Sequence, residues 1–449
     1  MPSPGSACRG EDGPFQSSHV CRSRGRDESS RLIESNMKPN TNSLLQPPDQ
    51  KIPRASTHLS SWMTVFLAAA CGLLAANIYY AQPLVGLIGA SLGLPRAATG
   101  LIVTMTQIGY GAGLLLIVPL GDLFENRRLT LVLVVLAAVA LLAAGASTQP
   151  GFFLAASLFV GLGTVAVQVL VPYAAHMAPE AERGRVVGNV MSGLMLGIML
   201  ARPVASFITQ LSSWHVVFML SGSAMAGLAL LLGWMLPRRV PTSRLRYADL
   251  LASMGRIATT MPVLRRRALY HACLFGAFSL FWTTTPLLLT ESFHLSQGEI
   301  ALFALAGVAG AIAAPIAGRV ADRGWTRIAT WAAMLAVAGA FLMTSIGEPG
   351  SHWRLAFLVV AAVVLDFGVS AHMTLGQRAI FGLDPALRAR LNGLYMSTFF
   401  IGGALGSGLG GWAYAEAGWW LTCCIGFALP VLALLYFATE PGTQTQTQT

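Results

Sequence analysis

From residue 62 onward, long apolar segments alternate with short polar ones along the chain. Crossing the hydrocarbon layer of a bilayer takes about 20 helical residues at a rise of about 1.5 Å per residue. The pattern therefore predicts an all-α membrane protein with twelve transmembrane helices. Their approximate bounds are 62–88, 98–120, 129–147, 152–175, 187–211, 216–236, 268–290, 299–318, 328–346, 355–376, 391–415 and 418–438.

The polar segments divide the chain into five regions. Residues 1–60 are rich in Ser, Gly, Arg and acidic residues, which is typical of a disordered tail. The longest internal polar stretch separates six helices from six, and we expect it to hold a short amphipathic helix on the membrane surface. The predicted regions are a tail at 1–60, a six-helix bundle at 61–236, a central loop at 237–267, a second six-helix bundle at 268–438 and a tail at 439–449.

The two bundles share an internal repeat. Arg183 and Arg388 open similar phrases 205 residues apart, and Trp214 and Trp419 have the same separation. Small residues also recur within these helices, in strips suited to close helix contact: Gly193, Gly197 and Ala201 in the fifth helix, and Gly402, Gly406 and Gly410 in the eleventh. The repeat predicts two pseudo-symmetric bundles with a solute site near the middle of the membrane, where they face each other.

Arginines are unevenly distributed among the predicted loops. One set of loops, which includes the central loop, contains most of them, whereas the opposite loops contain only Arg96 and Arg354. Basic loops are retained in the cytoplasm. Because the number of crossings is even, both termini are predicted to be cytoplasmic, with the protein in the plasma membrane of a bacterium, the inner membrane.

The composition excludes several other classes of protein. Charged residues make up 11% of the chain, far below the roughly 25% of a soluble domain. The net charge of +10 arises from arginines in short loops, so it reflects topology rather than nucleic-acid binding. The six cysteines have no disulfide or zinc spacing, and no catalytic cluster or nucleotide-binding phrase is present. We expect no metal, no cofactor and no enzymatic activity.

Charged hairpins follow the second and eighth helices. The first is Gly121–Arg128, and the second contains Gly318, Asp322, Arg323 and Arg327. They resemble the Gly-x-x-x-Asp-Arg-x-Gly-Arg-Arg signature of the major facilitator superfamily, although Trp325 replaces the later glycine of the second copy. Phrases at 77–84, 182–188, 200–203 and 365–369 are similar to efflux-type carriers of that superfamily, near its drug:proton antiporters and sugar-efflux permeases.

This resemblance implies a carrier that works by alternating access, in which the first, fourth, seventh and tenth helices line a central cavity. It also implies a cytoplasmic gate, a charge network that closes that side when the other is open. The gate residues would be Asp122, Arg127, Arg128, Asp322, Arg323 and Arg327. The alternative is that these arginines only fix topology, which leaves the paired aspartates unexplained. The chain departs from related proton antiporters in the fourth helix, where Ser157 stands in place of an arginine.

Two charged residues lie within predicted transmembrane helices. Arg202 is about 22 Å from the cytoplasmic end of the fifth helix, and Asp366 is about 17 Å from the other end of the tenth. A charge at such depth is costly, so we expect both to face the protein interior. The hypothesis is that Asp366 carries a coupled proton and Arg202 is its partner. The alternatives are an arginine that extends to the outer surface and, for Asp366, a static ion pair or a hydrogen bond to the backbone.

Uncharged polar and aromatic residues also occur within the helices. They are suited to a moderately apolar organic solute, and the alternative for each is a hydrogen bond that joins two helices. The candidates for the solute cavity are Asn77, Tyr80, Gln82, Gln107, Gln168, Trp282, Thr285 and Gln377.

Together these observations predict a secondary active transporter. We expect it to export small organic molecules, drug-like or sugar-like, by proton-coupled alternating access, with protons, the solute and the lipid bilayer as its partners and a monomer as its functional form. The alternatives are an uncoupled facilitator or importer and a solute sensor that transports nothing.

Overall fold

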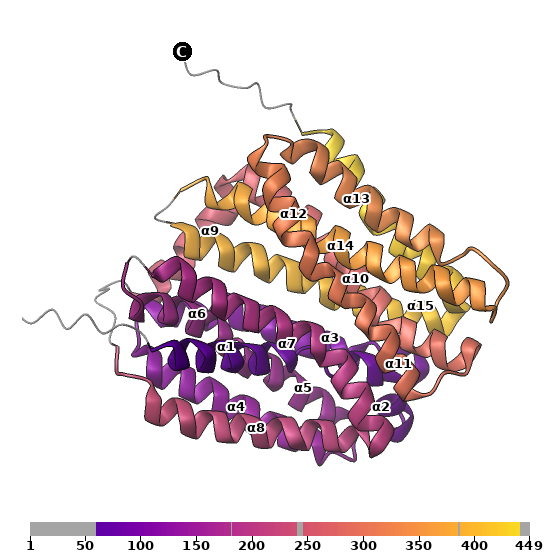
Figure 1. Cartoon of the computed structure of the whole chain (residues 1–449), viewed down its shortest axis with the longest axis horizontal. Coiled ribbons are helices and arrows are strands. Elements are labelled where there is room, and N and C mark those ends of the chain that lie inside the picture. Colours follow the sequence, from indigo (N-terminus) through magenta and orange to yellow (C-terminus); the bar gives the residue numbers. More distant parts are fainter. Residues whose placement is uncertain (1–59, 181, 240–245, 385–386, 441–449) are drawn as a thin grey trace, which may run out of the picture. The chain divides into compact units, whose positions relative to one another are not determined.

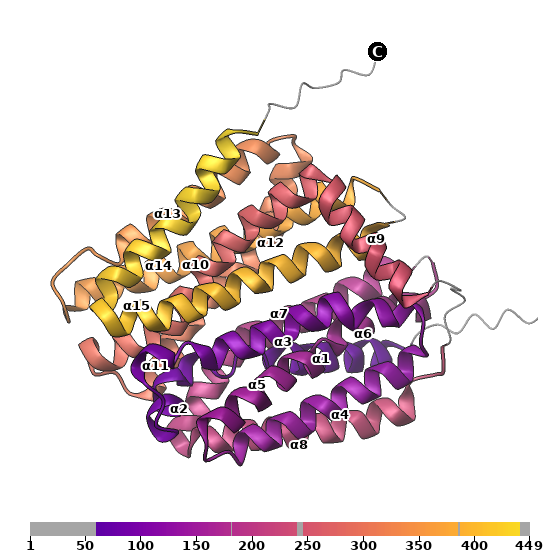
Figure 2. The ribbon, with the colours of Figure 1, turned by 180° about the vertical axis from the view of Figure 1, so that it is seen from behind.

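The structure, a computed structural model, is helical throughout the residues it describes, which are 60–180, 182–239, 246–384 and 387–440. The predicted terminal tails therefore lie almost entirely outside the described residues. Residues from Ser56 onward form one compact unit. Figures 1 and 2 show the helices that precede α9 gathered in one group and those that follow it in another.

The first group contains eight α-helices and three short 3₁₀ helices. In chain order they are α1 (Ser61–Ala76), η1 (Gln82–Leu84), α2 (Val85–Ser91), η2 (Arg96–Ala98), α3 (Leu101–Leu116), η3 (Val118–Asp122), α4 (Asn126–Gly145), α5 (Pro150–Thr164), α6 (Ala166–Met177), α7 (Arg183–Leu211) and α8 (Trp214–Met235). The central loop contributes α9 (Tyr247–Thr260). The second group comprises α10 (Pro262–Phe293), α11 (Gln297–Ala304), η4 (Leu305–Ala309), α12 (Gly310–Asp322), α13 (Thr326–Met343), α14 (His352–Phe381) and α15 (Arg388–Ala438).

These helices confirm the predicted crossings. Among the described residues, ten helical stretches are long and apolar enough to span a bilayer, and the shorter apolar helix α1 is an eleventh. The stretch named α15 is two helices, because the backbone leaves helical geometry at Ala417 and Gly418. Gly418 has φ = 62°, a left-handed conformation that glycine adopts at little cost. The total is therefore twelve.

Three of the crossings are interrupted, which the sequence analysis did not predict. The first was expected to be continuous over 62–88, but α1 ends at Ala76 and a turn leads into η1. Pro83 lacks a backbone N–H and so favours a break at this position. The fourth crossing changes from α5 to α6 at Val165, and η4 separates α11 from α12 in the eighth. Broken transmembrane helices release backbone groups and are common at the solute sites of carriers.

The glycine strips make the predicted close contacts, and the same contact occurs in both groups. A Cβ atom on Gly197 of α7 would lie 2.1 Å from the carbonyl oxygen of Gly72 of α1. A Cβ atom on Gly406 of α15 would lie 2.0 Å from the carbonyl oxygen of Gly276 of α10. No side chain fits at such distances, so the backbones pack directly on each other. The fifth crossing is thereby held on the first, as the eleventh is on the seventh.

The predicted amphipathic helix of the central loop is α9. Its apolar residues Leu250, Met254 and Ile257 are buried, and α9 contacts η3, α10 and α15. The Tyr247 hydroxyl donates to the carbonyl oxygen of Leu116 at 2.8 Å, and Arg390 donates to Ser253 at 2.8 Å. The helix therefore packs its apolar side on the protein and touches both groups of helices.

Candidate functional site

The two charged residues predicted inside the membrane are buried in the protein. The side chain of Arg202 on α7 is 3% exposed, and that of Asp366 on α14 is 4% exposed. Neither faces lipid, so the alternative in which Arg202 extends to the outer surface does not describe this structure. Arg202 lies on a helix before α9 and Asp366 on a helix after it, so the two charges belong to different groups of helices.

Arg202 is held by one amide and three aromatic rings. Its Nε donates a hydrogen bond to Oε1 of Gln82, the residue that opens η1, at 2.7 Å. Its guanidinium carbon lies 4.3 Å from the ring centre of Trp282, 5.1 Å from that of Phe278 and 5.2 Å from that of Tyr79. Aromatic faces attract a cation, and the attraction is stronger where water is excluded. The break in the first crossing is what brings Tyr79 and Gln82 to the charge.

Asp366 is held by Trp282, whose indole Nε1 donates to Oδ1 of the carboxylate at 2.7 Å. Gly307 of η4 lies beside both charges: a Cβ atom at this glycine would lie 2.9 Å from Oδ2 of Asp366 and 3.3 Å from Nη1 of Arg202. Oδ2 of Asp366 and Nη1 of Arg202 both lie close to this one point, so the distance between them cannot exceed the sum of 2.9 Å and 3.3 Å. Among the described ion pairs, none joins them directly within 4.0 Å.

A small cavity borders Arg202. Its volume is about 10 Å³, enough for roughly one water molecule. Besides Arg202 it is lined by Pro83, Trp282, Thr285, Pro286, Leu289, Ile300, Phe303 and Ala304. Arg202, Trp282 and Thr285 contribute polar groups to the lining, and the other lining side chains are apolar.

The structure brings three of the eight predicted cavity residues to the charged pair, namely Gln82, Trp282 and Thr285. Gln107 lies between the helix groups instead and donates to Ser279 of α10 at 2.8 Å. Three others make hydrogen bonds within one group: the Asn77 amide oxygen accepts from Ser221, Gln168 donates to Tyr110, and Gln377 donates to Asn392. Tyr80 packs on the apolar core. The place of these residues in the solute cavity remains a prediction.

The predicted gate residues do not pair with one another across the two groups in the part of the chain described. Asp122 is exposed, Arg128 pairs with Glu125 at 2.9 Å, and Arg127 donates to the carbonyl oxygen of Gly233. In the second hairpin, Asp322 pairs with Arg378 at 2.5 Å, and Arg327 donates to the carbonyl oxygen of Glu440; Arg323 is exposed. The closed gate remains a prediction for another conformation.

Four residues of importance were missed in the sequence. Tyr79 and Phe278 contact Arg202, and Gly307 lies beside both charges. In the sequence, Tyr79 and Phe278 could be recognised only because they lie near predicted cavity residues. Tyr79 adjoins Tyr80, and Phe278 lies one helical turn before Trp282. Ser279, the partner of Gln107, lies one helical turn before Thr283 on α10.

On the side opposite Ser61 of α1 and Ala438 of α15, the two groups of helices are in contact. Ser407 donates to the carbonyl oxygen of Gly100 at 3.1 Å, Thr104 donates to that of Ala404 at 2.9 Å, and Gln210 accepts from the amide of Gly298 at 3.0 Å. These contacts join α3 to α15 and α7 to α11. The site at Arg202 is consequently separated from solvent on this side.

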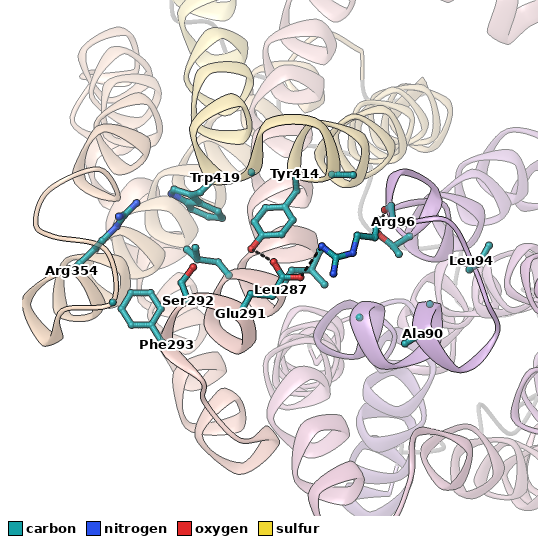
Figure 3. A pocket seen from close by; sticks show the side chains of 17 residues that line it. Ala90, Leu94, Arg96, Leu287, Glu291, Ser292, Phe293, Arg354, Tyr414 and Trp419 are labelled. Atoms are coloured by element: carbon teal, nitrogen blue, oxygen red, sulfur yellow. Dashed lines mark hydrogen bonds and ion pairs between the residues drawn. The ribbon is translucent and has the colours of Figure 1, made fainter.

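A larger cavity of about 600 Å³ lies on the same side, beyond these contacts. Figure 3 shows Glu291 of α10 at its centre, between Arg96 and Tyr414. Arg96 Nη1 is 3.8 Å from the Glu291 carboxylate, and the Tyr414 hydroxyl donates to it at 3.1 Å. Arg96 belongs to the first group of helices and Glu291 to the second, so this ion pair connects them across the cavity.

Twelve crossings in two similar groups, with a buried charged site where the groups meet, define a multi-pass membrane carrier. The chain belongs to the Major Facilitator Superfamily, whose family model matches residues 65–362 and 267–449. The protein is therefore a secondary transmembrane transporter and not an enzyme, as the sequence predicted.

Similar proteins agree with this assignment. The uncharacterized transporter YgaY of Escherichia coli O157:H7 is 39% identical over 84% of this chain and 95% of its own length. The probable transporter SCO4007 of Streptomyces coelicolor is 34% identical over 84% of this chain and 87% of its own. The crystal structure of the nucleoside transporter NupG has the same fold, with a TM-score of 0.66 and 14% identity over 84% of this chain and 97% of that one.

Proposed function

We propose that this protein exports small organic solutes by proton-coupled alternating access, with Asp366 carrying the proton. The observation that supports it is the position of the Asp366 carboxylate. It is buried, bonded to Trp282 and close to Arg202 beside Gly307, where helices of both groups meet.

The physical basis is the changing distance between the two charges. A buried carboxylate is costly in its charged form, and a nearby guanidinium offsets that cost. Because Asp366 and Arg202 belong to different groups of helices, rocking of the groups moves the two charges relative to each other. The carboxylate then binds a proton when Arg202 is distant and releases it when Arg202 approaches, so proton binding and conformation are linked.

The conformation of the structure fits one half of such a cycle. The side opposite Ser61 and Ala438 is closed by contacts of α3 with α15 and of α7 with α11. The predicted cytoplasmic gate makes its contacts within each group, which favours access from that side. The direction of export rests on the efflux-like phrases at 77–84 and 182–188.

The test begins with the identity of the solute. Compounds that accumulate in the medium only when the protein is expressed are identified by mass spectrometry. Each is then offered to everted membrane vesicles with an imposed pH gradient. For one of the two directions of the pH gradient, we expect the solute to reach a higher concentration inside the vesicles than outside. We expect Asp366→Asn only to equalise the two concentrations.

The matched control is Glu348→Gln, which removes an exposed acid in the loop before α14 and should leave accumulation unchanged. If Asp366→Asn accumulated the solute as the unmodified protein does, proton coupling through Asp366 would be wrong. Equilibration without accumulation by the unmodified protein would instead identify an uncoupled facilitator.

A further inference from the structure

Several buried hydrogen-bond donors around Arg202 have no partner in the described structure. They are Nη2 of Arg202 on α7, Nε2 of Gln82 on η1 and Oγ1 of Thr285 on α10. A buried donor without a partner costs about 1–3 kcal/mol, so such groups in one place indicate a ligand or ordered water. An arginine and an amide nitrogen only donate, which favours a ligand rich in acceptors.

The charge of Arg202 has no anion in direct contact. Asp366 is outside ion-pair distance, and its carboxylate is engaged by Trp282. The three aromatic faces stabilise the cation without neutralising it. A guanidinium is normally buried with a counter-ion, because its desolvation is costly otherwise. The site is therefore prepared for an anion that approaches Nη2.

The walls of the adjoining cavity indicate the rest of the ligand. Arg202 and Thr285 lie among side chains that are otherwise apolar, such as Leu289, Ile300 and Phe303. An inorganic oxyanion would need donors on all sides, whereas one guanidinium edge and one hydroxyl match a single carboxylate. In this conformation the cavity holds only about one water molecule, so a hydrocarbon or aromatic body would lie along these apolar walls only after the two groups of helices separate.

We infer that the transported solute is an organic anion, a carboxylate with an apolar body, whose carboxylate binds Arg202 and Thr285. This inference rests on the proposed function, because it assigns the solute class of the same site. With Asp366 protonated, the site has one net positive charge and accepts one anion. With Asp366 unprotonated, its charge competes with the solute for Arg202.

Anion and proton therefore strengthen each other's binding, and by linkage the effect is reciprocal. The proton remains on Asp366 while the solute's own charge is neutralised by Arg202, so the two cross together. Export would be driven by the outward concentration difference of the acid. Because the proton and the solute cross in the same direction, this coupling differs from the exchange of a cation for a proton.

The experiment measures binding to the purified full-length protein in detergent by calorimetry. The probes are acetate, butyrate, octanoate and benzoate, each compared with its neutral amide, and benzylamine as a cation, at mildly acidic and at alkaline pH. We expect at least one of the larger carboxylates to bind, more tightly at acidic pH, and its amide to bind at least about tenfold more weakly.

Variants connect the binding to the site. Arg202→Gln should weaken carboxylate binding by about tenfold or more, and Thr285→Val by a smaller factor, whereas Arg256→Gln on the exposed side of α9 should have no effect. Asp366→Asn imitates the protonated acid, so it should bind the carboxylate with little dependence on pH. Thermal unfolding without ligand shows whether Arg202→Gln is folded, and Thr285→Val gives an independent result if it is not.

Each outcome decides the inference. Tighter binding of an amide or of benzylamine, or Arg202→Gln and Thr285→Val both binding carboxylates as the unmodified protein does, would overturn it. If no carboxylate binds but Asp366→Asn still abolishes accumulation of another solute, the anion inference fails and the proposed function stands. If carboxylates bind through Arg202 but Asp366→Asn accumulates solute normally, the proposed function fails.

Discussion

At the scale of single residues, Gly307 lies beside both buried charges. A Cβ atom there would lie 2.9 Å from Oδ2 of Asp366 and 3.3 Å from both Nη1 of Arg202 and Cζ2 of Trp282. All three neighbours are side chains of the site, so they must shift to admit a methyl group. We expect Gly307→Ala to lower the rate of solute export by about tenfold, equivalent to about 1.4 kcal/mol.

The control for this prediction is Gly339→Ala in α13, where a new Cβ atom meets nothing within 4 Å. Export in vesicles is measured for both variants, together with thermal unfolding. Because both substitutions are in helical segments, stability should change little, by up to about 1 kcal/mol. Normal export by Gly307→Ala would show that this spacing is not required.

A second buried polar pair lies in the later group of helices. His271 of α10 and His372 of α14 are at most 1% exposed, and their Nδ1 atoms are 3.1 Å apart, so one ring donates and the other accepts. Replacing one leaves the other without its hydrogen bond, which costs about 1–3 kcal/mol. We expect His271→Leu and His372→Leu each to lower stability by that amount.

The double variant separates this effect from packing. With both rings replaced by leucine, no unpaired Nδ1 remains, so its stability should exceed the value expected from adding the two single effects. Chemical or thermal unfolding in detergent measures all four proteins. Strict additivity would mean that the hydrogen bond between the rings contributes nothing.

At the scale of helices, the paired glycine contacts fix how each group is assembled. Gly197 faces the backbone of Gly72, and a Cβ atom at this position would be 2.1 Å from a carbonyl oxygen that cannot move aside. We expect Gly197→Ala to destabilise the protein by about 1–3 kcal/mol, because α7 must move away from α1. Gly188→Ala, on the same helix with nothing within 4 Å of the new atom, is the control. Thermal unfolding that is unchanged in Gly197→Ala would contradict the direct backbone contact.

The same scale shows what the sequence can and cannot predict. Helix number, the glycine strips and the burial of Arg202 and Asp366 follow from local apolar pattern and the cost of charge in lipid. The breaks at Ala76 and at η4 do not, since a helix interruption depends on partners that replace its lost hydrogen bonds. Consequently the sequence does not show that the break brings Gln82 to Arg202, whereas Asn77, five residues earlier, bonds to Ser221 instead.

At the scale of the whole molecule, the carrier must separate its two groups of helices on the side that is closed here. Among the links that must break are the hydrogen bond of Ser407 with Gly100 and the ion pair of Arg96 with Glu291. The Arg96 side chain is 85% exposed and that of Glu291 is 48% exposed, so the pair contributes about 0–1 kcal/mol. A contribution of this size still changes the ratio of two conformations up to about fivefold.

We therefore expect Glu291→Gln to increase the fraction of molecules open on that side, by up to about fivefold. The measurement uses Ser407→Cys in a protein whose native cysteines are replaced by serine, with a membrane-impermeant thiol reagent added from that side. Ser407 is fully buried between α15 and the start of α3, so the introduced thiol reacts only when the groups separate. The labelling rate then reports the open fraction.

Two further variants make the result specific. Glu416→Gln removes another exposed acid from the same side and should label at the unmodified rate. The exchange of charges in Arg96→Glu with Glu291→Arg rebuilds an ion pair in reverse and should bring labelling back toward that rate. If Glu291→Gln labelled no faster than Glu416→Gln, the ion pair would not hold the closed conformation. The contacts of α3 with α15 and of α7 with α11 would then be sufficient to hold it.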